Sequence, residues 1–229
     1  MQKKLAVLVG GYPLTHFEKE QIRGLKGEKS YLIAVDGGLN AFYELTTLPD
    51  MLLGDMDSCS RTAYIWYCLH GKKQLFFPSN KDYLDMEAAI NLVNSLGIRE
   101  VFLFGVLGGR IDQTFSCLPF LLRGVALDLS ITIKSENCQM GIFNGPCENT
   151  FKTDVNSLWS FLAISDVVEG MTLKGFKFNV DKQNLLNTQT KALSNRAKSS
   201  KVIIKINKGI LLYFNKPGRQ ENVEHEESF

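Results

Sequence analysis

The pattern of apolar residues changes once along this chain of 229 residues, close to residue 130. Before that point, short apolar runs rich in β-forming residues alternate with segments whose apolar residues recur at helical spacing. This alternation is typical of βαβ units, in which parallel strands form one sheet and helices cover both of its faces. We therefore predict a Rossmann-like, mainly parallel α/β domain over residues 1–130.

The same periodicity places the elements of this first domain. The predicted strands are residues 5–9, 31–35, 51–53, 74–77 and 101–104. The predicted helices are residues 40–44, 61–69, 84–96 and 112–123, and residues 24–30 form a loop that ends an earlier helix. Asp82 or Tyr83 would cap the helix that begins at Leu84, and Gly97 would end it.

Beyond residue 130 the apolar runs are short and evenly spaced, with turn residues between them. The predicted strands are residues 131–134, 139–143, 157–164, 171–174, 201–206 and 209–214. Short strands without intervening helices favour an antiparallel β-sandwich. We predict a β-sandwich domain over residues 131–219, followed by a polar, disordered tail over residues 220–229.

The composition is that of a water-soluble protein, since 45% of the residues are hydrophobic and the formal net charge is only +2. That charge is too small to indicate binding to nucleic acid. No apolar run approaches the roughly 20 residues that span a bilayer, and the run after Lys4 is too short for a secretory signal. The five cysteines and three histidines lack the spacing of a disulfide framework or a zinc site. We expect a cytoplasmic protein without a membrane or nucleic-acid partner.

Three short blocks combine acidic residues with glycine or a cation, and each follows a predicted strand. They are residues 54–57 (GDMD), 81–85 (KDYLD) and 108–113 (GGRIDQ). Because the carboxyl ends of parallel strands meet at one edge of a sheet, we expect the blocks to converge there. Carboxylates, basic side chains and exposed backbone suit Mg²⁺ bound to a polyphosphate. The blocks therefore predict an ATP-using enzyme.

Each block also has a purely structural interpretation. Asp55 and Asp57 point the same way in an extended chain and could share a divalent ion, but they could instead cap a helix that begins near Ser60. The acidic residues at the start of the helix predicted over residues 84–96 could be there only because the helix dipole favours negative charge. The adjacent Lys81 favours the other interpretation, in which this block binds a triphosphate. Arg110 could bind phosphate oxygens with both prongs of its guanidinium group, or simply lie in a surface turn.

Together with further motifs, these blocks resemble the thiamine pyrophosphokinase family over nearly the whole chain. The motifs are, in order, residues 34–38 (AVDGG), 49–58 (PDMLLGDMDS), 81–85, 108–113, 172–178 (TLKGFKF) and 193–195 (LSN). The resemblance implies an N-terminal α/β domain, a C-terminal β-sandwich, and a homodimer whose thiamine sites are shared between subunits. It also implies that the thiamine hydroxyl attacks the β-phosphorus of MgATP and that AMP departs.

The resemblance assigns roles to individual residues. The implied ligands of Mg²⁺ are Asp55, Asp57, Asp82 and Asp85, and these four with Arg110 and Asp112 form the catalytic group. ATP would be bound by Asp36, Gly37, Lys81 and Arg110. Thiamine would be bound by Asp112, Gln113, Ser194 and Asn195. Leu84 replaces the family's usual threonine. The aromatic residue that often follows the Ser-Asn pair in the family is also missing after Asn195, so we expect Trp159 or Phe178 to stack on thiamine instead.

From the residues alone, two other functions stay open. A metal-dependent transferase could use Asp55 and Asp57 to hold a nucleotide sugar, and it would transfer or hydrolyse that sugar without responding to thiamine. A non-catalytic sensor of thiamine or nucleotide would bind its ligand without releasing AMP. Thiamine-dependent formation of AMP distinguishes both from a thiamine pyrophosphokinase.

Overall fold

The structure, a computed structural model, describes residues 4–76, 82–108 and 110–216 of the chain. The fold consists of two compact units, Met1–Ile142 and Phe143–Phe229. The sequence placed this division near residue 130. The first unit extends further because β6 (Ser130–Lys134) pairs in parallel with β5 (Glu100–Phe104), and β7 (Gln139–Asn144) then turns back to pair with β6. The expected disordered tail lies outside the described residues.

The first unit contains a sheet of parallel strands in the order β6-β5-β1-β2-β3-β4. Its remaining strands are β1 (Leu5–Val9), β2 (Ser30–Val35), β3 (Met51–Gly54) and β4 (Lys73–Phe76). β1 pairs with β2 on one side and with β5 on the other, so that Val9 lies beside both Ala34 and Phe104. The strand order therefore reverses at β1, and such a reversal opens a crevice beyond the carboxyl ends of the strands.

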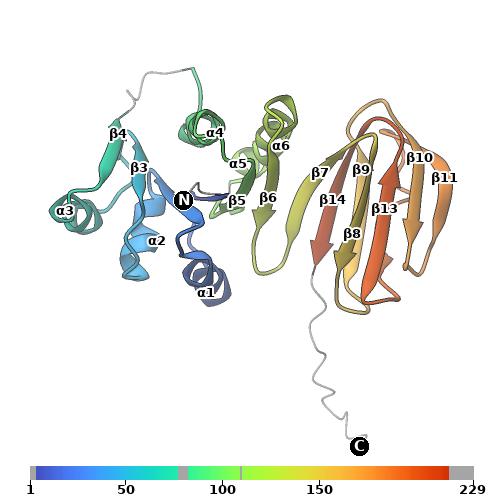
Figure 1. Ribbon diagram of the computed structural model, residues 1–229, viewed down its shortest axis with the longest axis horizontal. Helices are drawn as coiled ribbons and strands as arrows, with labels where there is room; N and C mark the ends of the chain where they lie inside the picture. Colours follow the sequence, from blue (N-terminus) through green and yellow to red (C-terminus); the bar gives the residue numbers. More distant parts are fainter. Residues whose placement is uncertain (1–3, 77–81, 109, 217–229) are drawn as a thin grey trace, which may run out of the picture. The chain divides into compact units, whose positions relative to one another are not determined.

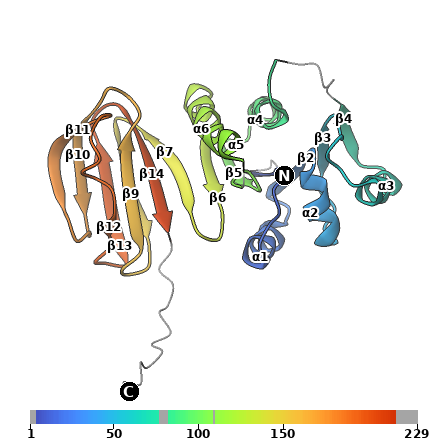
Figure 2. The same cartoon turned by 180° about the vertical axis from the view of Figure 1, so that it is seen from behind.

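Helices cover both faces of this sheet, as predicted. They are α1 (His16–Leu25), α2 (Gly38–Glu44), α3 (Arg61–Leu69), α4 (Asp85–Ser95), α5 (Ile111–Phe115) and α6 (Cys117–Ala126). Figure 1 shows α1 and α2 on one face and α4 and α6 on the other, and the reverse view in Figure 2 agrees. β1 is buried almost along its whole length because it is covered on both sides.

The helix boundaries show where local patterns were sufficient. α4 ends before Gly97, whose φ of 71° is the left-handed conformation expected after a helix, so this prediction is confirmed. The prediction that Asp82 or Tyr83 caps α4 is wrong, because Leu84 occupies that position and no side chain caps it. The single helix predicted over residues 112–123 is instead two helices that meet at Ser116.

The second unit is an antiparallel β-sandwich, and the predicted fold class is confirmed. Its strands are β8 (Cys147–Lys152), β9 (Leu158–Ala163), β10 (Val167–Lys174), β11 (Val180–Leu186), β12 (Asn195–Arg196), β13 (Lys201–Ile206) and β14 (Ile210–Lys216). One sheet has the order β11-β10-β13-β8, and β12, β9 and β14 are neighbours in the other. Apolar side chains from both sheets form one buried cluster.

Aromatic rings form the centre of that cluster. Trp159 is only 2% exposed, and its ring lies 6.1 Å from that of Phe161 and 5.9 Å from that of Phe176. Its indole N–H donates to the hydroxyl of Ser157, so the one polar atom of the ring is satisfied inside the protein.

Among the described residues, no helix is both long and apolar enough to cross a bilayer.

Candidate functional site

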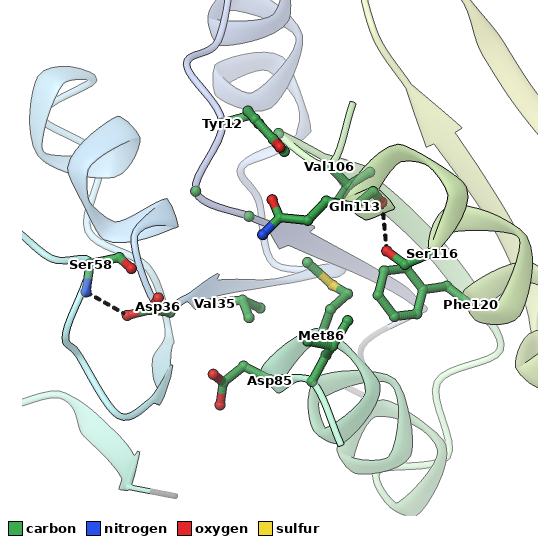
Figure 3. Close-up of a pocket in the computed structure, with 14 residues that line it drawn as sticks. Tyr12, Val35, Asp36, Ser58, Asp85, Met86, Val106, Gln113, Ser116 and Phe120 are labelled. Carbon is green, nitrogen blue, oxygen red and sulfur yellow. Dashed lines mark hydrogen bonds between the residues drawn. The ribbon is translucent and has the colours of Figure 1, made fainter. Parts of the chain in front are cut away.

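A cavity of about 300 Å³ lies in the first unit at the point where the strand order reverses. It is lined by Gly10, Gly11, Tyr12, Val35, Asp36, Ser58, Leu84, Asp85, Met86, Gly105, Val106, Gln113, Ser116 and Phe120. These residues lie at or shortly after the ends of β1, β2, β3 and β5, or within α4, α5 and α6 and at the residues that cap these helices. Figure 3 shows Asp36 and Ser58 on one side of the cavity and Gln113, Ser116 and Phe120 on the other. The cavity is therefore where the fold predicts a ligand.

Three carboxylates gather at one side of this cavity. Oxygen atoms of Asp36, Asp55 and Asp57 all lie within 4.8 Å of one another. Asp36 directly follows β2, whereas Asp55 and Asp57 follow β3, and these two strands are parallel neighbours. The sheet thus brings together carboxylates from two separate loops, and such a set of oxygen atoms fits a hard divalent cation.

Hydrogen bonds hold the loop after β3 against the end of β2. The backbone N–H of Ser58 donates to the carboxylate of Asp36 at 3.4 Å, and the Ser58 hydroxyl donates to Asp57 at 2.8 Å. The side chain of Asn40 donates to the Ser58 carbonyl and accepts from the backbone N–H of Ser60. The backbone N–H of Asp57 also donates to the carboxylate of Asp55 at 3.3 Å, so hydrogen bonds within the protein position all three carboxylates.

Part of this acidic cluster is shielded from water. Burial raises the pKa of Asp36 above the usual range of a carboxyl group, in spite of hydrogen bonds from Ser58 and Gly37. Burial also raises the pKa of the neighbouring Cys59 thiol to about 12, and the three carboxylates add to that shift. A bound cation would relieve this crowding of negative charge.

The structure excludes the alternative in which Asp55 and Asp57 cap α3. Ser60 is the N-cap residue, and its hydroxyl accepts from the backbone N–H of Ala63 at 3.2 Å. The capping position is thus occupied by a residue beyond the acidic pair.

The second acidic block lies at the start of α4. Asp85 is the first residue of the helix, is partly buried and lines the cavity, and Leu84 lines it as well. Asp82 is exposed. Within the described part of the chain, the group of three carboxylates includes neither Asp82 nor Asp85. Lys81 lies outside the described residues.

Arg110 and Asp112 bind each other at the start of α5. The guanidinium Nη2 donates to Oδ2 of Asp112 at 2.6 Å, and Nε donates to Oδ1 at 3.2 Å. This hydrogen-bonded pairing lowers the pKa of Asp112 and raises the pKa of Arg110. Both side chains are largely exposed, so water and ligands can compete for this pair. The next residue, Gln113, lines the cavity.

Ser194 and Asn195 lie in the second unit. Ser194 is exposed. Asn195 is only 4% exposed; its side-chain oxygen accepts from the backbone N–H groups of Phe178 and Arg196, and its amide nitrogen donates to the Phe178 carbonyl. In this conformation the Asn195 side chain is used to hold the β-sandwich together.

The two proposed stacking rings have opposite environments. Trp159 is buried in the aromatic cluster, so the expectation that it stacks on a ligand is wrong for this conformation. Phe178 is 59% exposed and has the ammonium group of Lys177 5.1 Å from its ring centre. Its ring is accessible from solvent.

Sequence reasoning missed several residues that line the cavity. They are Tyr12, Met86, Gly105, Val106, Ser116 and Phe120. Tyr12 had a usable signal, because it directly follows Gly10 and Gly11 at the carboxyl end of the first strand. The apolar residues had none, since they continue helices or strands whose patterns are explained by burial alone.

Comparison with known families gives two matches along the chain. Residues 22–133 match the description "Thiamin pyrophosphokinase, catalytic domain". Residues 149–211 match "Thiamin pyrophosphokinase, vitamin B1 binding domain". The two matches occur in the same order as the two structural units, and the first includes all three carboxylates of the acidic cluster.

Individual relatives agree with these matches. A thiamine pyrophosphokinase of Bacillus subtilis (strain 168) is 25% identical over 197 residues, which are 83% of this chain and 89% of the relative. Thiamine pyrophosphokinase 2 of Arabidopsis thaliana is 26% identical over 127 residues, which are 46% of this chain and 47% of the relative.

Solved structures share the fold. The crystal structure of a Bacillus subtilis thiamine pyrophosphokinase superposes with a TM-score of 0.85 at 22% identity, over 94% of this chain and 100% of that chain. A thiamin pyrophosphokinase from Candida albicans superposes with a TM-score of 0.80 at 15% identity, over 94% of this chain and 90% of that one. Both units of the present fold therefore occur together in these proteins.

Proposed function

Because the chain belongs to the thiamine pyrophosphokinase family of enzymes, we propose that it transfers the pyrophosphoryl group of MgATP to the hydroxyl group of thiamine. In this reaction a bond forms between the thiamine hydroxyl oxygen and the β-phosphorus of ATP. The bond between the β-phosphorus and the oxygen bridging to the α-phosphorus breaks, and the products are thiamine diphosphate and AMP. ATP as substrate agrees with a cytoplasmic location.

The observation that carries this proposal is the acidic cluster beside the cavity. Three carboxylates with oxygen atoms within 4.8 Å of one another supply the hard oxygen ligands that Mg²⁺ prefers. We propose Asp55 and Asp57 as ligands, with Asp36 completing the cluster, while Asp82 and Asp85 remain proposed ligands from the start of α4. When bound, Mg²⁺ would neutralise charge on the phosphate oxygens.

The cationic residues would neutralise the remaining phosphate charge. Arg110 can present two parallel N–H donors to phosphate oxygens, as it does to Asp112 in this structure. Lys81 is proposed as the second cation. Gly37 is buried directly before α2. Because glycine has no side chain, Ser58 in the loop after β3 can approach the Gly37 backbone closely. Its proposed role is to keep the backbone beside the ATP site compact.

Thiamine would be held by residues of both units. Gln113 lines the cavity and Asp112 lies at the start of the same helix, where its negative charge suits the cationic ring of thiamine. We propose that Ser194 and Asn195 complete the thiamine site from the partner subunit of a homodimer. Asn195 would act through the backbone shape that its buried side chain maintains, and exposed Phe178 would supply the stacking ring.

The direct test is to incubate the purified chain with MgATP in the presence and absence of thiamine and to quantify AMP and thiamine diphosphate by chromatography. The proposal predicts that both products form in equal amounts and only with thiamine. Binding of thiamine without release of AMP would indicate a sensor, and hydrolysis of a sugar nucleotide without a response to thiamine would indicate the sugar transferase.

A further inference from the structure

Tyr12 lies beside the cavity, directly after Gly10 and Gly11 at the end of β1. Its backbone is fastened to the end of β5: the N–H of Gly10 donates to the carbonyl of Phe104 at 2.8 Å, and the N–H of Tyr12 donates to that of Gly105 at 3.1 Å. The two central strands therefore set where the side chain of Tyr12 begins. No role for this residue followed from the sequence motifs.

The side chain of Tyr12 contacts the segment that carries Arg110 at two points. Its ring packs directly against Gly108: a Cβ atom added to that glycine would lie 2.0 Å from Cδ1 and 2.2 Å from Cε1 of Tyr12. Its hydroxyl oxygen accepts a hydrogen bond from the backbone N–H of Arg110 at 3.2 Å. One side chain thus positions the backbone both before and at Arg110.

The second support of this segment comes from α5, where the Thr114 hydroxyl donates to the carbonyl of Gly108 at 3.2 Å. Arg110 itself is exposed, so its guanidinium group is not held by burial. Its direction toward a ligand depends on where the backbone at Gly108 and Arg110 is held. A small displacement of a binding group can cost a large factor in rate or affinity.

We infer that Tyr12 is a positioning residue that holds Arg110 in place for phosphate binding, an inference that rests on the proposed use of ATP. The ring supports the backbone at Gly108, and the hydroxyl holds the backbone N–H of Arg110 directly before α5. Tyr12 acts through Arg110, so its contribution exists only while Arg110 is present.

The test is a double-mutant cycle between Tyr12→Ala and Arg110→Ala, read as binding of a non-hydrolysable ATP analogue with Mg²⁺ by calorimetry. We expect Tyr12→Ala to weaken binding about tenfold in the wild-type background and less than twofold in the Arg110→Ala background. In the kinetic assay, Tyr12→Ala should raise KM for ATP in the wild-type background and change it little in the Arg110→Ala background. An equal loss in both backgrounds would overturn the inference, because Tyr12 would then contact the ligand itself or act on the fold in general.

Two further variants keep the test decisive. Tyr12→Phe retains the ring over Gly108 and removes only the acceptor for the Arg110 N–H, so we expect it to fold normally and to bind the analogue about threefold more weakly than the wild type. It replaces Tyr12→Ala in the cycle if that variant folds poorly. Tyr43→Ala is the matched control, because Tyr43 packs on Trp66 outside the cavity, and it should bind the analogue as the wild type does. A wild type that forms no AMP would contradict the proposed function, whereas an active wild type with an additive cycle would contradict only the role of Tyr12.

Discussion

At the scale of single residues, Asp36 combines an unusual backbone with an unusual ionisation. Its φ of 47° lies in the left-handed region, which aspartate and asparagine tolerate better than most residues. Burial raises its pKa, so the folded protein binds a proton at this site more readily than the unfolded chain does. At neutral pH the ionised carboxylate therefore destabilises the metal-free protein.

Asp36→Asn should raise the melting temperature of the metal-free protein at pH 7, because the amide keeps the backbone conformation and removes the buried charge. The difference from the wild type should shrink as the pH is lowered from 7 to 4, because the raised pKa of Asp36 lets the folded wild type take up a proton more readily than the unfolded chain does. Calorimetry in a chelating buffer at both pH values checks this. Added Mg²⁺ should stabilise the wild type more than the variant, and a variant that melts below the wild type at pH 7 would contradict the argument.

Asp55→Asn and Asp57→Asn should each abolish turnover and leave the fold intact, because each substitution keeps the size of the side chain but removes charge that Mg²⁺ requires. We expect a loss of at least about a hundredfold, comparable with the loss of one electrostatic group in other active sites. AMP formation measured over a series of Mg²⁺ concentrations checks this. Asp181→Asn, an exposed aspartate of β11, is the control and should keep full activity. Near-normal turnover of either variant at limiting Mg²⁺ would remove that residue from the metal site.

At the scale of elements, α2 starts directly against the end of β1. A Cβ atom on Gly38, the first residue of the helix, would lie 1.9 Å from the carbonyl oxygen of Val9. The close approach needs glycine, because any side chain at this position would overlap the backbone of β1. A side chain here would push the start of α2 away from the end of β1.

Gly38→Ala should therefore destabilise the first unit by about 1–3 kcal/mol, the usual cost of overpacking a core. Gly24→Ala is the matched control, because Gly24 lies within α1 and a Cβ there meets nothing within 4 Å. Alanine favours a helix interior over glycine, so this control should gain up to about 1 kcal/mol. Thermal unfolding of both variants provides the measurement, and equal melting temperatures would mean that the β1–α2 junction can relax without cost.

At the scale of the whole molecule, the proposed homodimer with shared thiamine sites has a specific consequence. Asp112 lies in the first unit and Ser194 in the second. If each site combines one unit from each subunit, a dimer of one Asp112→Ala chain and one Ser194→Ala chain carries one site with both defects and one with neither. Asn195 is unsuitable for this test, because its side chain holds the backbone at Phe178 and its removal would perturb the β-sandwich.

Mixing the two variants under conditions of demonstrated subunit exchange should restore activity toward about half of the wild-type value per mixed dimer. The control mixture is Asp112→Ala with Gln113→Ala, since both defects then lie in the same unit and every site keeps one of them. This mixture should show no recovery. Recovery in neither mixture would mean that each thiamine site is built within one chain.

Most strands and helices were predictable because their apolar spacing is a local property. β1, β3, α3 and β13 all occur where their periodicity placed them. β8, β11 and β12 were missed because they are edge strands, which need few apolar residues. α1 was not delimited, although its capping box of Thr15 and Glu18 is visible in the sequence.

The amino-acid sequence was sufficient to identify the chemical groups that are present, namely carboxylates and glycines directly after strands, in an order that resembles one family. Which of these groups meet became clear from the three-dimensional fold alone. Asp36 joins Asp55 and Asp57 because β2 and β3 are neighbours in the sheet, and Tyr12 reaches Arg110 because β1 and β5 are. Periodicity reports only which face of an element is buried, whereas these contacts depend on strand order and register, which are set by packing between segments distant in the chain.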